Sequence, residues 1–389
     1  MAEQVPIGVG VVGAGWMGHV HARAYTRLPH HYPDVDVVPR IVAVADTVPA
    51  NLEDFARLFG NPRTYPDWRG LLADPEVEAV SVAAPNALHR EIGVAVAEAG
   101  KHLWIEKPVG LTIEDARAVA DAVAKAGVQA AVGFNYRNLP AVARARELVA
   151  VGAIGTPTHG RVTLRTDYAA HPGATLSWRF ALAQGGHGVL GDLASHGVDL
   201  VRYLLGDIAE LVADTAVFIR RRPLATPGAG HYAAVEEPRE DQPMGEVENE
   251  DYVCALLRTR SEVRVMFEAS RVGVGDQNAY GFEVHGTKGY VAWDFRRSDE
   301  LMVSSGGGYT NQPAQTLYAG PGDGEYARFQ PGAGIAMGYD DSKVIEAAAF
   351  LRAVCTGTSH GATLTDAVRS AQVLDAMVES AKKRMWVRI

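Results

Sequence analysis

The stretch GVGVVGAGWMG, residues 8–18, decides the fold of this chain, because it joins a predicted strand to a predicted helix through closely spaced glycines. It matches the pattern G-x-G-x-x-G twice, but the first match lies within the strand. In the second match, Gly13 permits a tight turn, Gly15 lets the backbone approach a pyrophosphate, and Gly18 lets the helix pack on the strand. The N-terminus of that helix offers unpaired N–H groups to phosphates. The stretch therefore predicts a dinucleotide-binding site.

The sequence around this stretch alternates short apolar runs with helical patterns. Continuous apolar runs are typical of parallel strands that are covered on both faces. They stand at residues 7–12, 40–46, 78–85 and 102–108. Helices are predicted between them, and one opens with a capping box of Thr112 and Asp115 and ends at Gly127. This alternation predicts a doubly wound α/β domain with a parallel sheet over residues 1–133.

Asp46 ends the second predicted strand, where a dinucleotide-binding domain places an acid for the adenine ribose. Its separation from Gly18 exceeds the usual spacing of about 20 residues, and we interpret residues 28–39 as an inserted loop. A carboxylate accepts hydrogen bonds from a free ribose but repels a 2′-phosphate. Because no Arg or Lys follows Asp46 in the segment DTVPA, the sequence predicts NAD as the cofactor in preference to NADP.

The second part of the chain has a different pattern. Apolar residues alternate with polar ones over residues 160–168, 262–270 and 280–295. Such alternation predicts a mostly antiparallel sheet. Residues 222–250 are rich in Pro, Gly and acidic residues and predict a long surface loop, and residues 363–384 predict an amphipathic helix. We expect residues 134–389 to form a second domain that contains this sheet.

The composition disfavours several classes of protein. With 389 residues, 47% hydrophobic and 21% charged, the chain is long enough for two globular domains. A formal net charge of -9 disfavours a nucleic-acid partner or an anionic membrane surface. No apolar run is long enough to span a bilayer, and no signal-peptide pattern is present. Cys254 and Cys355 are expected to be reduced and buried, and we expect a cytoplasmic protein.

A second stretch, GDLASHGVDLVRYLLGD at residues 191–207, carries an acid, a histidine and a second acid on a predicted helix. Asp192, His196 and Asp199 share one face at α-helical spacing. The arrangement fits a capped, partly buried histidine, a proton-transfer pair or a metal site. A metal site needs further ligands, of which His187 is the nearest candidate, and we expect no metal. We assign Asp199 a structural role.

Motifs along nearly the whole chain resemble those of the glucose–fructose oxidoreductase and inositol dehydrogenase (Gfo/Idh/MocA) family. They are GVVGAGWMGHVHARAY, YPDWRGLLADPEVEAV, APNALHREIGVAVAEAGKHLWIEKP, FNYRNLPAV, GAIG, LSWRF and the helix with Asp192 and His196. The resemblance implies an N-terminal Rossmann domain and a C-terminal α/β domain, residues 134–389, on a large open sheet that serves substrate binding and oligomerisation. It also implies homodimers or homotetramers that pair these sheets face to face, and a cis proline in the EKP turn. FNYR, LSWRF and GYDDSKVIEAAAFL look most like the family's anhydrosugar and cyclitol dehydrogenases.

The resemblance further assigns roles to individual residues. Lys107 of EKP, Asp192 and His196 match the family's catalytic lysine, acid and histidine. Cofactor contacts are expected for Gly13, Gly15, Trp16, Met17, Gly18, Asp46, Asn86, His89, Glu106 and Lys107. Substrate contacts are expected for Lys107, Asn135, Tyr136, Asp167, Arg179, Asp192 and His196. His19 and His21 are expected to pack within their helix rather than to bind a ligand.

These observations predict NAD-dependent oxidation of a secondary hydroxyl of a cyclic sugar, a levoglucosan-like anhydrosugar or a polyol to the ketone, with hydride transfer to nicotinamide C4. His196 would be the base, Asp192 would orient it or bind an adjacent hydroxyl, and Lys107 would stabilise developing alkoxide charge. An inositol dehydrogenase is one alternative. The others are a glycosidase or lyase that uses NAD transiently and a non-catalytic dinucleotide-binding regulator, and the presence of all three residues argues against a regulator.

Overall fold

The computed structural model describes residues 4–224 and 242–389, and the chain divides into two compact units. The first unit comprises Met1–Asn138, Ala327–Gln330 and Met337–Arg369. The second unit comprises Leu139–Tyr326, Pro331–Ala336 and Ser370–Ile389. The first unit thus contains more than the residues 1–133 expected from the sequence, because two later segments return to it.

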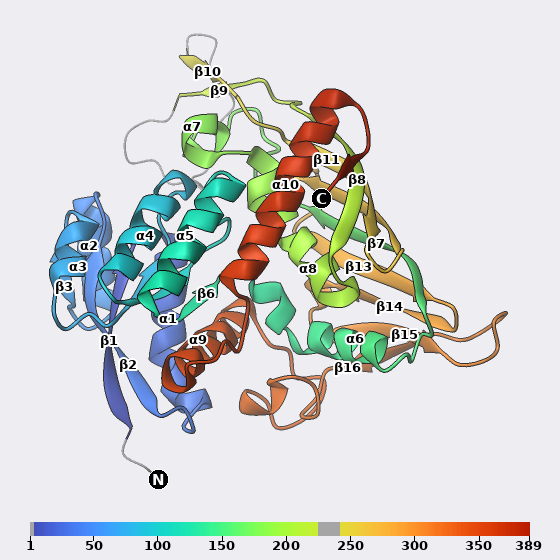
Figure 1. Ribbon diagram of the computed structural model, residues 1–389, viewed down its shortest axis with the longest axis horizontal. Helices are drawn as coiled ribbons and strands as arrows, with labels where there is room; N and C mark the ends of the chain where they lie inside the picture. Colours follow the sequence, from blue (N-terminus) through green and yellow to red (C-terminus); the bar gives the residue numbers. More distant parts are fainter. Residues whose placement is uncertain (1–3, 225–241) are drawn as a thin grey trace. The chain divides into compact units, whose positions relative to one another are not determined.

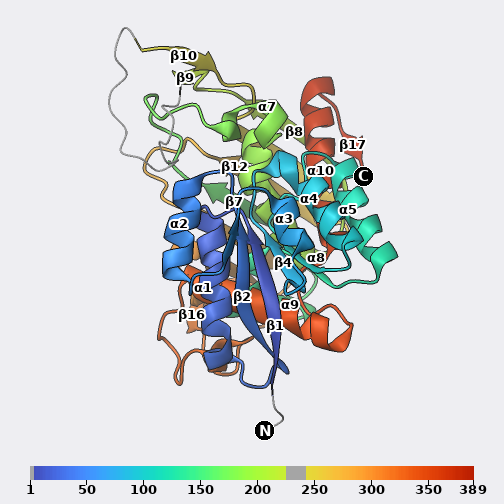
Figure 2. The same ribbon diagram turned by 90° about the vertical axis from the view of Figure 1, so that its left-hand side faces the viewer.

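The first unit contains a six-stranded parallel sheet in the order β3-β2-β1-β4-β5-β6, which is the order of a Rossmann fold. Its strands are β1 (Val5–Val12), β2 (Val37–Ala45), β3 (Arg63–Tyr65), β4 (Ala79–Val82), β5 (His102–Ile105) and β6 (Ala130–Val132). Helices cover both faces of the sheet (Figure 2). They are α1 (Trp16–His31), α2 (Pro49–Leu58), α3 (Trp68–Ala73), α4 (His89–Glu98) and α5 (Ile113–Ala126). The predicted doubly wound domain is confirmed.

Short sequence motifs determine where several of these elements begin and end, as the sequence predicts. The Thr112 hydroxyl accepts a hydrogen bond from the Asp115 N–H at 3.3 Å, and the Asp115 carboxylate accepts one from the Thr112 N–H at 3.2 Å. Gly127 ends α5 with a φ of 69°, a left-handed conformation that glycine adopts without strain. The apolar runs in β1, β4 and β5 are buried on both faces, as strands of a covered parallel sheet should be.

Helix α9 (Tyr339–Thr356) completes the first unit although it lies more than 200 positions after β6. It packs on α1, and its buried side chains join a core cluster with residues of β1 and β5. Val344, Phe350 and Leu351 of α9 are fully buried in this cluster, next to Trp104 of β5. The helix is therefore part of the core of the nucleotide-binding unit.

The second unit is built on a nine-stranded sheet in the order β16-β15-β14-β13-β7-β12-β11-β8-β17. Neighbouring strands are antiparallel except for β7 and β12, which confirms the predicted mostly antiparallel sheet. The strands are β7 (Pro157–Arg165), β8 (Ile208–Ala216), β11 (Tyr252–Thr259), β12 (Arg264–Ser270), β13 (Ala279–Gly286), β14 (Gly289–Asp294), β15 (Glu300–Ser305), β16 (Gln315–Tyr318) and β17 (Val387–Arg388).

One face of this sheet packs against helices α6 (Pro140–Ala150) and α8 (Ser195–Leu205) (Figure 1). Gly197 explains how α8 comes so close to the strands. A Cβ atom at Gly197 would lie 2.4 Å from the Leu164 Cδ1 atom and 2.6 Å from the Phe267 ring. A glycine that weakens the helix locally is therefore the residue that lets α8 rest directly on β7 and β12.

The opposite face of the sheet carries exposed apolar side chains among charged ones. The strand registers place one row of side chains across this face: Val212, Leu256, Met266, Arg161, Glu283, Ala292, Met302 and Thr316. Leu256 is 50% exposed, Met266 54% and Met302 44%. We call this row and its neighbours the outer face.

Three expectations need correction. Residues 28–39, interpreted as an inserted loop, contain the end of α1, up to His31, and the start of β2, from Val37, so that only residues 32–36 connect the two elements. The predicted loop 222–250 begins and ends in a small antiparallel pair, β9 (Arg221–Pro223) and β10 (Met244–Glu246), while residues 225–241 lie outside the described residues. Cys355 is exposed, because it lies in the last turn of α9, and Cys254 is half-buried on the outer side of β11; both are free thiols. Among the described residues, no helix combines the length and the hydropathy needed to cross a bilayer.

Candidate active site

The glycine loop has the geometry that its sequence predicts. Gly13 has a φ of 94°, and a Cβ atom there would lie 2.6 Å from the Ala83 carbonyl oxygen. A Cβ atom at Gly18 would lie 1.9 Å from the Gly13 carbonyl oxygen, so only glycine lets α1 start this close to β1. Gly15 differs, because a Cβ atom there would meet nothing within 4 Å. The fold itself does not demand glycine at position 15, which fits a requirement for space by a ligand.

Asp46 lies directly after β2 and is tied to the glycine loop. Its Oδ2 atom accepts a hydrogen bond from the Ala14 N–H at 2.8 Å, and its Oδ1 atom accepts one from the Val48 N–H at 2.8 Å. These two bonds fix the carboxylate at the carboxyl end of the parallel sheet, where open α/β sheets bind their ligands. The expected ribose acid and the expected pyrophosphate loop are therefore neighbours.

Trp16 follows Gly15 at the start of α1 and is 56% exposed. Its indole stacks on the ring of Tyr339, with ring centroids 5.6 Å apart, and the Tyr339 hydroxyl points to the sulfur of Met17 at 3.8 Å. Tyr339 is the first residue of α9, and no local signal in the sequence connects it with the glycine loop.

Lys107 follows β5, and the Lys107–Pro108 peptide bond is cis, as the resemblance implies. The Lys107 side chain is half-buried. His89 supports this turn from α4: its Nδ1 atom lies 2.7 Å from the Pro108 carbonyl oxygen, and its Nε2 atom 2.8 Å from that of Ala84. Because His89 is only 1% exposed and both ring nitrogens face the backbone, we assign it to support of the turn rather than to the expected cofactor contact. Asn86 begins the short helix that follows β4.

Glu106 directs its carboxylate into a buried charged cluster. Its Oε1 atom lies 2.9 Å from the His21 Nε2 atom and 2.5 Å from the Lys343 Nζ atom. Lys343 also contacts the Oε1 atom of Glu346 at 3.0 Å, and Glu346 accepts a hydrogen bond from the Trp104 indole at 2.6 Å. The carboxylate of Glu106, a residue that was expected to contact the cofactor, is therefore engaged inside the first unit.

The charges in this cluster follow from burial and proximity. Burial lowers the pKa of His21 to about 4, so its imidazole is neutral near pH 7, and its ring stacks on Trp104 as expected for a packing residue. Burial opposes ionisation of both Glu106 and Lys343, but their mutual attraction lowers the pKa of Glu106 and raises that of Lys343. Burial raises the pKa of Glu346 to about 7.

His21, Glu106 and Glu346 bring three groups of metal-ligand type within 4.8 Å of one another. The ammonium of Lys343 contacts an oxygen of each acid and supplies the positive charge that the ionised Glu106 carboxylate requires. The cluster is therefore an internal ion-pair network among the residues that the structure describes, and it gives no support for a metal ion.

The second unit positions Asp192 and His196 in a way that the sequence did not predict. A π-helical turn, Leu190–Ala194, precedes α8 and contains Asp192, whereas His196 and Asp199 lie within α8. In a π turn the hydrogen bonds join residues five apart, so Asp192 is offset from the single α-helical face that we expected. Asp192 is half-buried, His196 is 8% exposed and Asp199 is 2% exposed. π turns often occur at functional sites.

Glu250 fixes the start of the π turn. Its carboxylate accepts a hydrogen bond from the Leu190 N–H at 3.1 Å, and its carbonyl oxygen accepts one from the Val189 N–H at 2.9 Å. Burial raises the pKa of Glu250. The half-buried His187 precedes this turn and lies outside it.

Tyr168 is the neighbour of Asp192 that the sequence did not reveal. Its hydroxyl donates a hydrogen bond to the Asp192 Oδ2 atom at 2.6 Å, from the loop that follows β7. Burial and the Asp192 carboxylate raise the pKa of Tyr168 well above its usual value, so the phenol remains a donor over the working range of pH. Asp167, the residue expected to contact substrate, precedes it and is half-buried.

The remaining expected substrate residues divide between the units. Asn135 and Tyr136 are buried in a short helix of the first unit, and the Asn135 amide donates a hydrogen bond to the Ser342 hydroxyl at 3.1 Å. Arg179 belongs to the second unit, and its guanidinium lies over the Trp178 ring at 4.4 Å. Lys107 thus lies in the first unit, and Asp167, Arg179, Asp192 and His196 lie in the second.

A doubly wound sheet with an open glycine loop, a helix N-terminus and an acid after the second strand defines the first unit as a dinucleotide-binding domain. Residues 7–134 match the family model described as oxidoreductase family, NAD-binding Rossmann fold. Residues 142–292 match the model for the GFO/IDH/MocA C-terminal domain. The chain belongs to the Gfo/Idh/MocA family of oxidoreductases.

Several named relatives are similar over their full length. Levoglucosan dehydrogenase of Pseudarthrobacter phenanthrenivorans is 36% identical over 98% of both chains. The solved structure of a levoglucosan dehydrogenase in complex with NADH and levoglucosan has a TM-score of 0.91 and 35% identity over 99% of both chains. Inositol 2-dehydrogenase of Rhizobium meliloti is 26% identical over 98% of both chains.

Proposed function

We propose that this protein is an NAD-dependent dehydrogenase that oxidises a secondary hydroxyl of a cyclic sugar, anhydrosugar or polyol to the ketone. The observation that carries the proposal is the full-length similarity, at 36% identity, to a levoglucosan dehydrogenase. The chain also retains the lysine, acid and histidine that such chemistry needs, at Lys107, Asp192 and His196.

NAD supplies the hydride acceptor, at C4 of its nicotinamide ring. Gly13, Gly15 and the N-terminus of α1 are suited to the pyrophosphate, and Asp46 to the adenine ribose. Trp16, Met17, Asn86, Glu106 and Lys107 complete the set that we propose near the cofactor. For Glu106 this contact would come from the backbone, because its carboxylate contacts His21 and Lys343.

His196 acts in this proposal as the general base that removes the proton from the hydroxyl being oxidised. An imidazole suits this task because its usual pKa, about 6.5, lies near the working pH. Asp192 orients His196 or binds an adjacent hydroxyl. Lys107 donates to the same oxygen and stabilises the negative charge that develops on it. Asn135, Tyr136, Asp167 and Arg179 are proposed to contact the rest of the sugar.

We further propose a homodimer or homotetramer formed through the outer face. Its row of side chains carries Leu256, Met266 and Met302, each more than 40% exposed. Apolar side chains this exposed on a wide sheet are typical of a surface that a partner covers. Two free cysteines fit a reducing compartment, and we propose the cytoplasm as the location.

A panel of sugars tests the proposed function. Purified protein with NAD and either levoglucosan, myo-inositol, scyllo-inositol or an aldopyranose should accumulate NADH, measured by absorbance, with at least one of them. Preference for myo-inositol would support the inositol dehydrogenase alternative, for which the similarity to inositol 2-dehydrogenase is the specific observation. Release of a cleaved glycoside without net NADH would instead identify a glycosidase or lyase. Binding of NAD without turnover of any sugar would refute the dehydrogenase.

A further inference from the structure

The loop that follows β7 carries a tyrosine that contacts the proposed catalytic acid. The Tyr168 hydroxyl lies 2.6 Å from the Asp192 Oδ2 atom, which is within the range of a strong hydrogen bond from a hydroxyl to a carboxylate. Such a bond fixes which carboxylate oxygen is engaged and limits the rotation of the acid. Asp192 lies in a π turn, whose backbone does not share the regular geometry of α8.

The loop itself is held by hydrogen bonds on both sides of Tyr168. The Thr166 N–H donates to the Ser270 carbonyl oxygen at 2.9 Å, and the Ala169 N–H donates to the Arg271 carbonyl oxygen at 3.0 Å. These bonds tie the loop to the end of β12. The backbone around Tyr168 is therefore anchored two residues before it, at Thr166, and directly after it, at Ala169.

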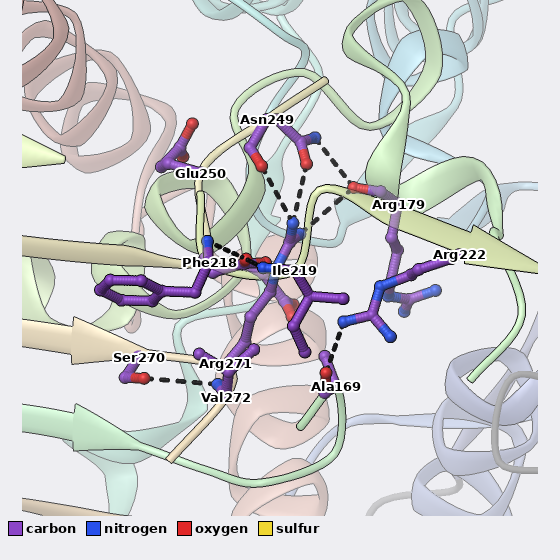
Figure 3. Close-up of polar contacts among 12 residues, drawn as sticks. Ala169, Arg179, Phe218, Ile219, Arg222, Asn249, Glu250, Ser270, Arg271 and Val272 are labelled. Carbon is purple, nitrogen blue, oxygen red and sulfur yellow. Dashed lines mark hydrogen bonds and ion pairs between the residues drawn. The ribbon is translucent and has the colours of Figure 1, made fainter. Parts of the chain in front are cut away.

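Two buried arginines, Arg222 and Arg271, also anchor the loop that carries Tyr168. The Arg222 guanidinium donates to the carbonyl oxygens of Ala169, at 2.5 Å, and His171, at 3.0 Å (Figure 3 shows the bond to Ala169). Arg222 is 0% exposed, and its Nε atom has no hydrogen-bond partner among the described residues. Burial lowers the pKa of Arg222 to about 10. A buried guanidinium with an unsatisfied donor costs stability.

Arg271 completes this anchor. Its guanidinium forms an ion pair with Asp251 at 2.9 Å and donates to the side-chain and main-chain oxygens of Asn249, as Figure 3 shows for the Asn249 contacts. The ring of Phe180 lies 4.4 Å from the Arg222 guanidinium carbon and 4.5 Å from that of Arg271. The two arginines are therefore fixed relative to each other, and through them the loop is fixed relative to β12.

From this chain of contacts we infer that Tyr168 is a positioning residue, which holds the Asp192 carboxylate in the orientation that the reaction uses. This inference rests on the proposed function of Asp192. It assigns Tyr168 no contact with substrate or cofactor, and it requires the phenol only as a hydrogen-bond donor. The buried arginine pair then serves the reaction indirectly, because it fixes the loop from which the phenol reaches Asp192.

Tyr168→Phe removes the hydroxyl and keeps the ring, so the loop and the fold should be retained. We expect kcat with the best sugar of the panel to fall about ten- to a hundred-fold, the range for a lost hydrogen bond to a charged group. The affinity for NAD, measured by fluorescence titration, should change less than two-fold. Crystal structures of the two proteins should show the Asp192 carboxylate rotated or disordered in the variant.

Tyr326→Phe is the matched control. Tyr326 is a tyrosine of the second unit that is fully buried, whereas Tyr168 is half-buried, and the Tyr326 hydroxyl donates to the carbonyl oxygens of Gly332 and Ile335. The control should lower Tm and leave kcat per NAD-binding site unchanged, whereas Tyr168→Phe should lower both Tm and kcat per NAD-binding site.

Wild-type kcat in Tyr168→Phe, or an Asp192 carboxylate that keeps its position without the phenol, would overturn the inference. So would a loss of activity that only parallels a loss of folded, NAD-binding protein. If the wild-type protein forms no NADH with any sugar, the proposed function fails. In that case the position of Asp192 in the two crystal structures still decides whether Tyr168 holds it.

Discussion

Glu346→Gln tests the buried charged cluster beneath the EKP turn. Glu346 is 3% exposed, and burial raises its pKa from the usual 4.5 to about 7. Below pH 4.5 both the folded and the unfolded chain hold this proton. Between pH 4.5 and 7 the unfolded chain releases it and the folded chain keeps it, so folding takes up a proton and stability falls as the pH rises. Above pH 7 the loss of stability is complete.

The size of the effect follows from the shift in pKa. A rise from 4.5 to about 7 corresponds to about 3 kcal/mol of unfolding free energy lost between pH 4.5 and pH 7. For a unit of this size that loss lowers Tm by roughly 5–10 °C. Glutamine cannot ionise, but its carbonyl oxygen can accept the same bonds from Trp104, at 2.6 Å, and Lys343, at 3.0 Å. The variant should therefore fold and lack this part of the pH dependence.

Tm measured by calorimetry from pH 5 to pH 8.5 checks the prediction. The Tm of Glu346→Gln should rise relative to that of the wild type as the pH rises towards 7, because only the wild type loses the stability that the Glu346 proton provides. Other titrating groups contribute to the Tm of both proteins, so their effects cancel in this difference. Glu379→Gln is the control, since Glu379 lies in a surface ion pair with Lys383 at 2.7 Å. A difference that stays constant, or that grows as the pH falls, would refute the assignment of a raised pKa to Glu346.

Four further predictions concern the cofactor, the chemistry, the assembly and the helix packing. Asp46→Ala should lower kcat/KM for NAD about ten-fold or more and lower that for NADP less, measured by initial rates; equal effects on both cofactors would contradict the ribose contact. His196→Ala should lower kcat about 100- to 10,000-fold with little change in NAD affinity, and an active, stable variant would leave Lys107 as the proton acceptor. The kcat/KM of the wild type should rise with pH as a histidine base deprotonates. Met266→Arg should shift the mass measured by light scattering towards one chain, and a wild-type monomer would remove the proposed interface. Gly197→Ala should lower Tm and kcat together, because its Cβ atom would lie 2.4 Å from Leu164 and such overpacking costs about 1–3 kcal/mol. Gly307→Ala, at an exposed glycine, should change neither Tm nor kcat.

The sequence predicts those features that depend on neighbouring residues. The glycine loop, the capping box of α5 and its glycine C-cap each depend on a few consecutive residues, and all three are confirmed. The alternation in β7, β12 and β13 likewise predicts their buried faces, because the period of a strand is local. The fold class and the glycine loop could therefore be predicted from the sequence.

The features that were missed depend on contacts between distant positions. Lys343 and Glu106 are 237 positions apart, and nothing near either residue predicts their ion pair. The π turn at Asp192 depends on hydrogen bonds between residues five apart, which composition does not reveal, although Gly191 lies within the turn and Glu250 contacts its first residue. Tyr168 could have been suspected, because it follows the expected substrate residue Asp167 directly.

Both units support a proposed site residue with charges that are wholly buried. Lys343 is 0% exposed and holds Glu106, the residue before Lys107, while Arg222 is 0% exposed and holds the loop of Tyr168. Buried ion pairs contribute little to stability, since desolvation offsets much of the attraction between the charges. Such buried charged groups instead fix the orientation of the groups that they bind, because each hydrogen bond restricts an angle as well as a distance. The arrangement therefore favours fixed geometry at the EKP turn and at Asp192 over the stability that apolar side chains would give in the same places.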